Sequence, residues 1–242
     1  GGTPAEPNMR ARLSWAQVNR ALVRGDEQER ENIAAVLPML TTAETLARAI
    51  HDVRSARGSL DFDLPEPEIL FNFQGETQDI RPKVRHFGHQ IVEEFMIAAN
   101  EAVARFLTEK GAPVLYRVHP ESDPTKVEAL FKLLATTDLA TKLPPTPGPG
   151  DLPMVLREAS GSDLDFLVSR LALRTMMQAS YSPKLDGHFG LASTCYCHFT
   201  SPIRRYADLV VHRSLKNVFA GKPVSEKRAA RLCGAFILIR HG

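Results

Sequence analysis

The sequence predicts a mixed fold of the α/β (α+β) type. Several stretches repeat apolar residues every three or four positions, as amphipathic helices do, and the longest covers about 87–110. Two short β-type segments, 69–73 and 77–81, flank a turn that contains Gly75 and predict a hairpin. Another short strand is expected at 114–119. Helices mixed with a few short strands indicate a domain that combines α and β structure.

The first helices are expected between residues 14 and 57. Ser14 is a favoured N-cap type and stands directly before a helical pattern. Residues 32–57 carry apolar side chains at helical spacing, and Thr41-Thr42 predicts a break that divides them into two amphipathic helices. The segment 59–67 should be extended, because its two prolines disfavour helix in the residues before them.

The helix at 87–110 carries an apolar stripe and two polar residues beside it. The expected stripe is Val92, Phe95, Met96, Ala99, Val103 and Phe106. Glu93 and Asn100 are seven residues apart, so they share one line at the edge of this stripe. From the residues alone, both are expected to face solvent.

The middle of the chain alternates helices and loops. A helix is expected at 125–136. The run 143–153 holds five prolines and two glycines and predicts an irregular surface loop. A helix at 162–178 should follow, capped by Ser162 or Asp163.

These elements are expected to form one domain over residues 12–242, which the loop at 143–153 interrupts. Residues 1–11 are polar and are expected to form a loose N-terminal segment.

The stretch 198–213 predicts an anion-binding site. Ser201 is a favoured N-cap and Pro202 a favoured first helical residue, so a helix is expected to begin here. Arg204 and Arg205 would then lie in its first turn, beside unpaired backbone N–H groups and the positive end of the helix dipole. That combination favours a phosphate group. The apolar stripe expected to bury this helix is Ile203, Tyr206, Leu209, Val210, Leu215 and Val218.

Composition and charge are those of a soluble protein with a basic end. The formal net charge is +2, but residues 201–242 carry nine Lys/Arg and two Asp/Glu. This asymmetry indicates a polyanionic partner, although a solvated basic helix face would fit equally well without the motif. No run approaches the roughly 18 apolar residues of a membrane span. Three cysteines provide no disulfide framework, which favours a reducing, cytoplasmic location.

Four motifs, in this order, resemble the ribonuclease II / ribonuclease R (RNB) family of 3′-to-5′ exoribonucleases. They are Leu60-Asp-Phe-Asp-Leu-Pro-Glu, Val92-Glu-Glu-Phe-Met-Ile-Ala-Ala-Asn-Glu, Gly187-His-Phe-Gly-Leu and His198-Phe-Thr-Ser-Pro-Ile-Arg-Arg-Tyr. The resemblance extends from about Arg12 to about Arg231. It implies an RNB-type catalytic domain with a buried RNA channel, which hydrolyses single-stranded RNA to nucleoside 5′-monophosphates with Mg²⁺.

The resemblance also implies roles for single residues. Arg204 matches the family's catalytic arginine at the scissile phosphate. Phe62 matches an aromatic residue on which RNA bases stack. Glu93 matches an acid that helps to read the ribose 2′-hydroxyl, with an ambiguity of one residue because Glu94 follows it.

Three further residues of the last motif, Thr200, Ser201 and Arg205, are expected to contact the RNA. On a strand, without the family, a lone phenylalanine such as Phe62 is more often a core residue.

One part of the family pattern is missing. The family holds its metal with an aspartate cluster ahead of all four motifs, and Glu6 is the only acid before Arg12. The chain is therefore expected to be a catalytic domain incomplete at its N-terminal side, without metal ligands and inactive when isolated. Its expected partners are single-stranded RNA and the missing part of the domain, in the same polypeptide or a second chain. The alternative is a non-catalytic RNA-binding or structural fragment of the same fold.

Two metal sites are weaker interpretations. Cys195 and Cys197 lack the usual spacing of zinc ligands, and small buried strand residues fit them better. Asp61 and Asp63 point the same way on an extended strand but supply too few ligands for a cation.

A hydrolase that uses His198, Ser201 and Asp208 is also disfavoured, because no strand-turn nucleophile elbow surrounds the serine. Asp208 could instead hold Arg204, four residues earlier, or Arg205, three residues earlier.

Overall fold

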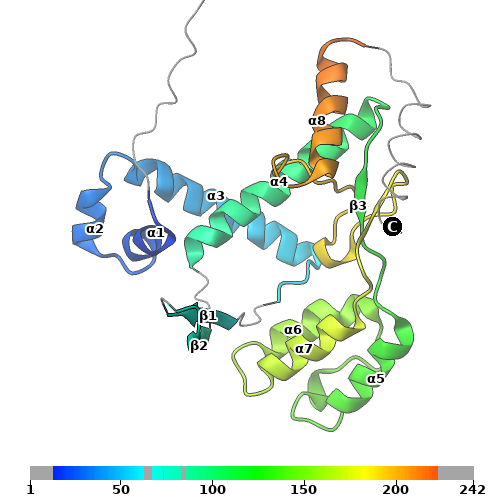
Figure 1. The fold of residues 1–242 in the computed structure, drawn as a ribbon. Helices are drawn as coiled ribbons and strands as arrows, with labels where there is room; N and C mark the ends of the chain where they lie inside the picture. The colour runs from blue at the N-terminus through cyan, green and yellow to red at the C-terminus, as the bar shows by residue number, and fades with distance from the viewer. Residues whose placement is uncertain (1–12, 63–66, 73, 83–85, 223–242) are drawn as a thin grey trace, which may run out of the picture. The chain divides into compact units, whose positions relative to one another are not determined.

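The computed structural model describes residues 13–62, 67–72, 74–82 and 86–222 (Figure 1). The chain divides into two compact units, each described by itself. The first comprises Gly1–Val53 and Pro65–Met96, and the second comprises Arg54–Leu64 and Ile97–Gly242. The segment 1–11, expected to be loose, lies outside the described residues.

The first unit begins with three helices, α1 (Trp15–Leu22), α2 (Glu27–Asn32) and α3 (Leu37–Arg57), the last of which ends in the second unit. The predicted cap at Ser14 is confirmed. Its hydroxyl accepts the N–H of Gln17, and its own N–H donates to the Gln17 side chain, which together make a capping box. A small core forms around Ala21, Ile33 and Val36.

The predicted break at Thr41-Thr42 is wrong, because α3 runs without interruption through both residues. The Thr41 hydroxyl donates to the carbonyl of Leu37 at 3.0 Å, and the Thr42 hydroxyl to the carbonyl of Pro38 at 2.9 Å. Both side chains therefore satisfy their polar groups inside the helix instead of ending it.

The predicted hairpin is confirmed. Strands β1 (Pro67–Phe71) and β2 (Thr77–Pro82) pair antiparallel. In the turn between them, the side-chain oxygen of Asn72 accepts the N–H groups of Gln74 and Glu76 at 3.0 and 2.9 Å. Gly75 has a φ of +81°, which glycine adopts without strain.

Helix α4 (Phe87–Glu109) is where the sequence predicts it, but it buries a neighbouring line of residues. Val92, expected in the buried stripe, is 41% exposed, whereas Asn100, expected to face solvent, is 3% exposed. The buried line is Ile91, Glu94, Ile97, Asn100, Ala104 and Leu107. Two of these residues are polar, so apolar spacing alone does not identify this face.

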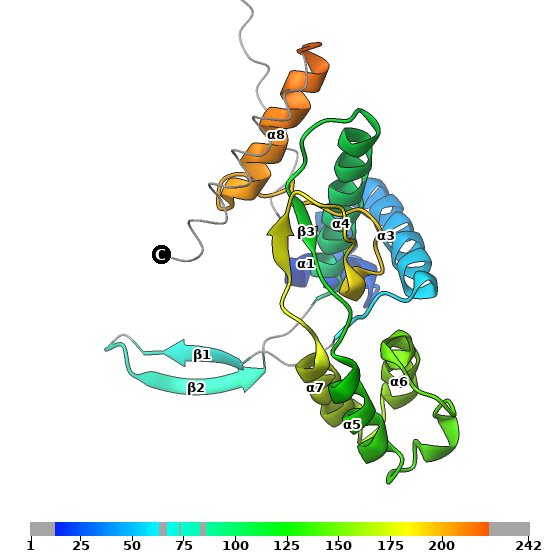
Figure 2. The ribbon, with the colours of Figure 1, turned by 90° about the vertical axis from the view of Figure 1, so that its right-hand side faces the viewer.

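In the second unit, two strands pair side by side, and the chain segment between them forms a helical bundle (Figures 1 and 2). Strand β3 (Tyr116–Val118) pairs antiparallel with β4 (Ser180–Ser182). Between them lie α5 (Pro124–Leu134), α6 (Leu152–Ala159) and α7 (Asp165–Thr175). Their shared core is centred on buried aliphatic side chains, among them Leu134, Leu152, Val155 and Val168.

The proline-rich run at 143–153 is more regular than predicted. Pro149–Asp151 form a 3-10 turn, and α6 begins at Leu152 with a proline in its first turn. Proline is tolerated there because the first N–H groups of a helix have no intrahelical partner. Helix α7 also begins later than predicted and is not capped by Ser162, whose hydroxyl donates to the carbonyl of Ala159.

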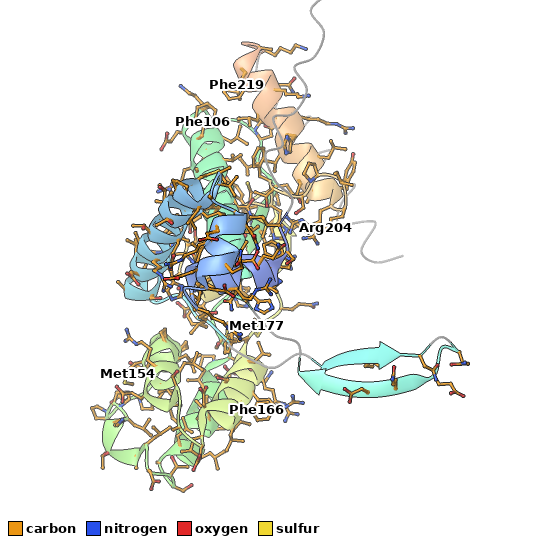
Figure 3. The ribbon with its side chains drawn as sticks, turned by 90° about the vertical axis from the view of Figure 1, so that its left-hand side faces the viewer. Phe106, Met154, Phe166, Met177, Arg204 and Phe219 are labelled. Atoms are coloured by element: carbon orange, nitrogen blue, oxygen red, sulfur yellow. The ribbon has the colours of Figure 1, made fainter. Side chains whose placement is uncertain are left out.

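A second core of this unit joins α8 (Tyr206–Phe219) to the later part of α4 and to β3. Leu107, Cys197 and Val211 lie at its centre, and the rings of Phe106 and Phe219 are 5.8 Å apart at the far end of α8 (Figure 3). No helix in the described part of the chain has both the length and the apolar character that a membrane span needs.

Candidate nucleic-acid interface

The last motif forms a turn that precedes α8. Helix α8 begins at Tyr206 with Arg205 as its N-cap residue. The N–H groups of Arg204 and Arg205 both donate to the carbonyl of Ser201, at 3.3 and 3.1 Å, and close the turn. The prediction of a helix capped by Ser201 and beginning at Pro202 is therefore wrong.

Asp208 holds this turn to the helix. Its side chain is fully buried, and its Oδ1 accepts the N–H of Ser201 at 2.7 Å. The guanidinium of Arg205 donates to both carboxylate oxygens at 2.8 Å. Of the two arginines that Asp208 was expected to hold, it holds Arg205, which keeps only 23% of its side chain exposed. The bidentate pair neutralises the buried charge and fixes where the turn ends.

Asn100 on α4 holds the other end of the turn. Its side-chain oxygen accepts two successive backbone N–H groups, those of Phe199 at 2.9 Å and Thr200 at 3.2 Å. Its amide N–H donates to the hydroxyl of Tyr196 at 3.0 Å. From α8, Nε2 of His212 donates to the carbonyl of Phe199 at 2.9 Å, and the two rings stack. Two helices thus fix the backbone that leads into the turn.

Arg204 projects from the turn that these contacts fix. Its side chain is exposed, and no hydrogen bond or ion pair joins it to another of the described residues. In Figure 3 it lies at the end of α8 opposite Phe219. Ile203, predicted to be buried, is 101% exposed, and Tyr206 is 50% exposed. The predicted stripe is therefore wrong at its first two positions, because the helix starts later and buries the face of Ala207, Asp208, Val210, Val211 and Ser214.

A tyrosine and a neutral histidine lie beside the turn. The hydroxyl of Tyr181 and Nδ1 of His198 are hydrogen-bonded at 2.7 Å, and the guanidinium of Arg117 stacks over the Tyr181 ring. Burial lowers the pKa of His198 to about 4, and the positive charges of Arg205 and Arg117 reinforce the shift. Burial also raises the pKa of Tyr181. The positive charge around the turn at neutral pH is therefore carried by arginines.

The segment that carries Phe62 is held by another motif. The N–H of Leu60 donates to the carbonyl of Gly190 at 2.9 Å, within the Gly187-His-Phe-Gly-Leu motif. Arg57 pairs with Glu101 on α4 at 2.7 Å and also donates to the carbonyl of Leu191 at 3.3 Å. These contacts fix the segment shortly before Phe62.

Two features of this region bear on the sequence predictions. Gly190 must stay small, because a Cβ there would lie 3.1 Å from Nδ1 of His119. Phe62 is half-buried and packs against the core of the helical bundle. The prediction that Phe62 is a core residue is therefore correct for one part of the ring, and the rest of the ring is accessible to solvent.

The acidic pair on α4 splits into a buried and an accessible residue. Glu94 is 2% exposed and lies 3.1 Å from Nδ1 of His51. Glu93 is only half-buried. Glu93 belongs to the first unit, whereas Phe62 and the turn with Arg204 belong to the second.

The three residues of the alternative hydrolase do not form a catalytic relay. Nδ1 of His198 is bonded to Tyr181, and the carboxylate of Asp208 is occupied by Arg205 and the backbone of Ser201. Among the residues that the structure describes, no three His, Cys, Asp or Glu side chains lie close enough to hold a metal ion. Asp61 is exposed, and Asp63 lies outside the described residues.

Sequence reasoning missed the side chains that support the turn. Tyr196, Tyr181 and His212 are ordinary core candidates in the sequence. Asn100 was noticed only for its helical spacing relative to Glu93. The contacts of Asn100 join segments about one hundred residues apart, for which no local pattern gives a signal.

An exposed arginine on a turn fixed by buried polar side chains has the chemistry to bind a phosphate group. Comparison with known proteins then gives the family. The model of the RNB domain matches residues 8–221, and the chain belongs to the RNB family. The resemblance and the RNB-type fold predicted from it are both confirmed.

Ribonuclease R proteins are among the relatives. The chain is 42% identical to ribonuclease R of Aquifex aeolicus over 224 residues, which are 92% of this chain and 32% of that protein. It is 29% identical to Mycoplasma genitalium RNase R in complex with ribose methylated single-stranded RNA, with a TM-score of 0.75, covering 91% of this chain and 34% of that one. A complex of the same protein with double-stranded RNA gives a TM-score of 0.76. The chain spans about a third of the length of these relatives.

Proposed function

We propose that the protein carrying this chain is a 3′-to-5′ exoribonuclease that hydrolyses single-stranded RNA to nucleoside 5′-monophosphates. Membership of the RNB family and the similarity to ribonuclease R support this proposal. The Mycoplasma relative binds RNA in two solved complexes. The observation that carries the proposal is Arg204, which is exposed, has no side-chain partner among the described residues and lies on a turn that buried side chains hold in place.

Arg204 is proposed to bind the scissile phosphate. A guanidinium presents several N–H donors in one plane and remains charged at any working pH, so it can neutralise charge that grows on phosphoryl oxygens. The neighbouring Arg205 is committed to Asp208, which leaves Arg204 as the arginine of this pair that can turn toward a ligand.

Other groups around the turn fit the same ligand. The side chain of the N-cap residue, Arg205, makes no capping hydrogen bond to the first turn of α8. The hydroxyl of Thr200 is buried and has no hydrogen-bond partner among the described residues, which is unusual for a buried polar atom. We propose that Thr200 and Ser201 contact the RNA backbone, while Arg205 acts mainly by shaping the turn.

Phe62 and Glu93 are proposed to bind other parts of the nucleotide. A phenyl ring held on one side by a core can stack a base on its other side, without preference for sequence. Glu93 would accept a hydrogen bond from a ribose 2′-hydroxyl, which distinguishes RNA from DNA. The buried pairing of Glu94 with His51 supports Glu93 as the acid of this pair.

We propose Mg²⁺ as the metal of the complete enzyme. The described residues do not fit such a site, because no cluster of carboxylates forms among them. The proposal therefore places the metal ligands elsewhere, in the same polypeptide or in a second chain, and expects no nucleotide release from the isolated 242 residues. Cys195 and Cys197 are free thiols, which supports a reducing, cytoplasmic location.

Replacement of Arg204 in the full-length protein tests the function. Arg204→Ala should lower kcat on single-stranded RNA by about 10²–10³, the usual loss for one transition-state donor, with a smaller loss of RNA affinity. Lys216→Ala removes an exposed positive charge from α8, the helix that follows the turn, and should leave both turnover and RNA affinity nearly unchanged. Nucleotide release and RNA binding are measured in parallel.

The same measurements separate the alternatives. An equal loss of affinity and turnover in Arg204→Ala would limit this residue to binding. Salt-sensitive RNA binding by the wild-type full-length protein without any metal-dependent turnover would instead establish the non-catalytic alternative.

Phe62→Ala tests base stacking. It should weaken RNA binding by roughly five- to 100-fold, the range for loss of one stacked base, or lengthen the final product. Phe166→Ala removes another phenyl ring, 53% exposed on α7, and serves as the matched control. Equal effects of the two substitutions on binding would contradict the assignment of Phe62.

A further inference from the structure

We propose that Asn100 is the positioning residue that holds the turn of Arg204 in place. Asn100 itself is 3% exposed and does not contact the proposed substrate. It acts through the backbone of Phe199 and Thr200, directly before the turn. The catalytic part of this inference rests on the proposed role of Arg204, whereas the structural part does not.

Few side chains could replace Asn100 in its contacts with the loop. One side-chain oxygen receives two successive backbone N–H groups, which requires an acceptor with two lone pairs at a fixed depth in the core. The amide N–H on the other side donates to the hydroxyl of Tyr196. Because the two backbone N–H groups can only donate, they fix the amide with its oxygen toward the loop.

Two anchors from different helices define the turn. Asp208 on α8 holds the N–H of Ser201 and the guanidinium of Arg205. Asn100 on α4 holds the backbone of the two residues before Ser201. Between these anchors, the turn is closed by backbone N–H groups that donate to the carbonyl of Ser201. The position of Arg204 therefore depends on both anchors.

Loss of the Asn100 oxygen would leave two N–H groups in the interior without their acceptor. Buried donors without partners are costly, so the loop is expected to shift toward other acceptors. A shift of about 1 Å at a catalytic group can cost as much as 100-fold in rate. Asn100 is thus expected to affect the chemical step more than RNA affinity.

The test compares Asn100→Ala with Tyr196→Phe in the full-length protein. Tyr196→Phe removes the hydroxyl that Asn100 binds but leaves the two loop N–H groups paired, so it controls for a general loss of hydrogen bonding in the core. Hydrogen exchange should show faster exchange at Phe199 and Thr200 in Asn100→Ala, with α4 and α8 still protected. Tyr196→Phe should keep the wild-type pattern at both residues.

Turnover completes the test. Asn100→Ala should lower kcat by about 10- to 100-fold with KM changed less than about threefold. When Arg204 is already replaced by alanine, Asn100→Ala should lower kcat little further, because Asn100 is proposed to act only by positioning Arg204. Retained protection at Phe199 and Thr200, or losses that multiply with those of Arg204→Ala, would overturn the inference.

Two further outcomes are decisive. If Asn100→Ala does not fold, Asn100→Asp keeps oxygen acceptors for both N–H groups and should preserve their protection, whereas fast exchange in that folded variant would refute the positioning role. If Arg204→Ala leaves turnover intact, the proposed function of Arg204 fails, while the exchange measurements still decide whether Asn100 holds the turn.

Discussion

Asp208 carries a negative charge at a position with no solvent contact. A buried carboxylate is tolerated when charged and hydrogen-bonded partners replace water, and here Arg205 and the N–H of Ser201 do so. The pair joins the turn that carries Arg204 to the core of α8. Its removal should therefore affect the fold as well as the site.

Asp208→Asn is expected to lower the free energy of unfolding by about 3 kcal/mol, the lower end for breaking a buried pair, because Arg205 is partly exposed. The asparagine NH₂ group would replace one of the two oxygens that accept from Arg205, so that two hydrogen-bond donors would face each other. Glu128→Gln breaks a pair with Lys132 that is open to solvent and should cause no measurable change. Urea denaturation of both variants measures the difference, and equal midpoints would contradict the assignment.

The sequence predicts the active turn better at some residues than at others. The resemblance locates Arg204, and the spacing of Asp208 narrows its partner to two arginines. Neither shows that Asp208 chooses Arg205, or that Asn100 lies beneath the loop. Both contacts depend on how distant segments of the chain pack together in the core. The local sequence around each residue does not determine this packing.

At the scale of elements, the second unit is a strand pair with a helical bundle inserted between its strands. Strands β3 and β4 pair, and α5, α6 and α7 lie between them in the chain. The bundle has a core of its own, to which Phe62 adds its ring. The packing of this bundle therefore supports one face of the proposed stacking site.

Leu152→Ala tests the bundle core. Leu152 is fully buried, and its truncation should lower the free energy of unfolding by about 3 kcal/mol. Leu133→Ala, at a position 47% exposed on α5, should stay within about 0.5 kcal/mol of wild type. Hydrogen exchange of the bundle segments measures both changes in the full-length protein. A similar loss in the two variants would show that the core lies elsewhere.

Element boundaries were predicted well where local chemistry decides them. Ser14 caps α1, and the hairpin β1–β2 is where its turn residues place it. The start of α7 was predicted too early, because the hydroxyl of Ser162 bonds to the carbonyl of Ala159 and the N–H of Leu164, before the helix. The start of α8 was predicted too early, because Ser201 belongs to a separate turn that its carbonyl closes. A residue of a capping type therefore does not by itself determine where a helix begins.

At the scale of the whole molecule, buried histidines make stability depend on pH. Burial and the neighbouring His119 lower the pKa of His188 to about 3, and burial lowers that of His198 to about 4, from an ordinary value of 6.5. The unfolded chain therefore takes up these protons first as the pH falls. Stability from both neutral rings is complete above pH 6.5 and is lost as the pH falls from there toward 4.

Unfolding by urea should accordingly occur at a lower midpoint at pH 5 than at pH 7.5. His198→Gln keeps an acceptor for the hydroxyl of Tyr181 but cannot titrate, so its midpoint should change less between the two pH values. An unchanged pH dependence in His198→Gln would exclude this histidine as a source of the effect.

The contact between Arg57 and the carbonyl of Leu191 spans 134 residues of chain. During protein synthesis, the segment with Phe62 leaves the ribosome long before the residues that fasten it. At roughly 5–20 residues per second, the wait is of the order of ten seconds. The backbone of Phe199 likewise reaches Asn100 only after most of the chain has been made. The residues proposed to bind RNA are therefore expected to become ordered together and late, after the segments that support them have been synthesised.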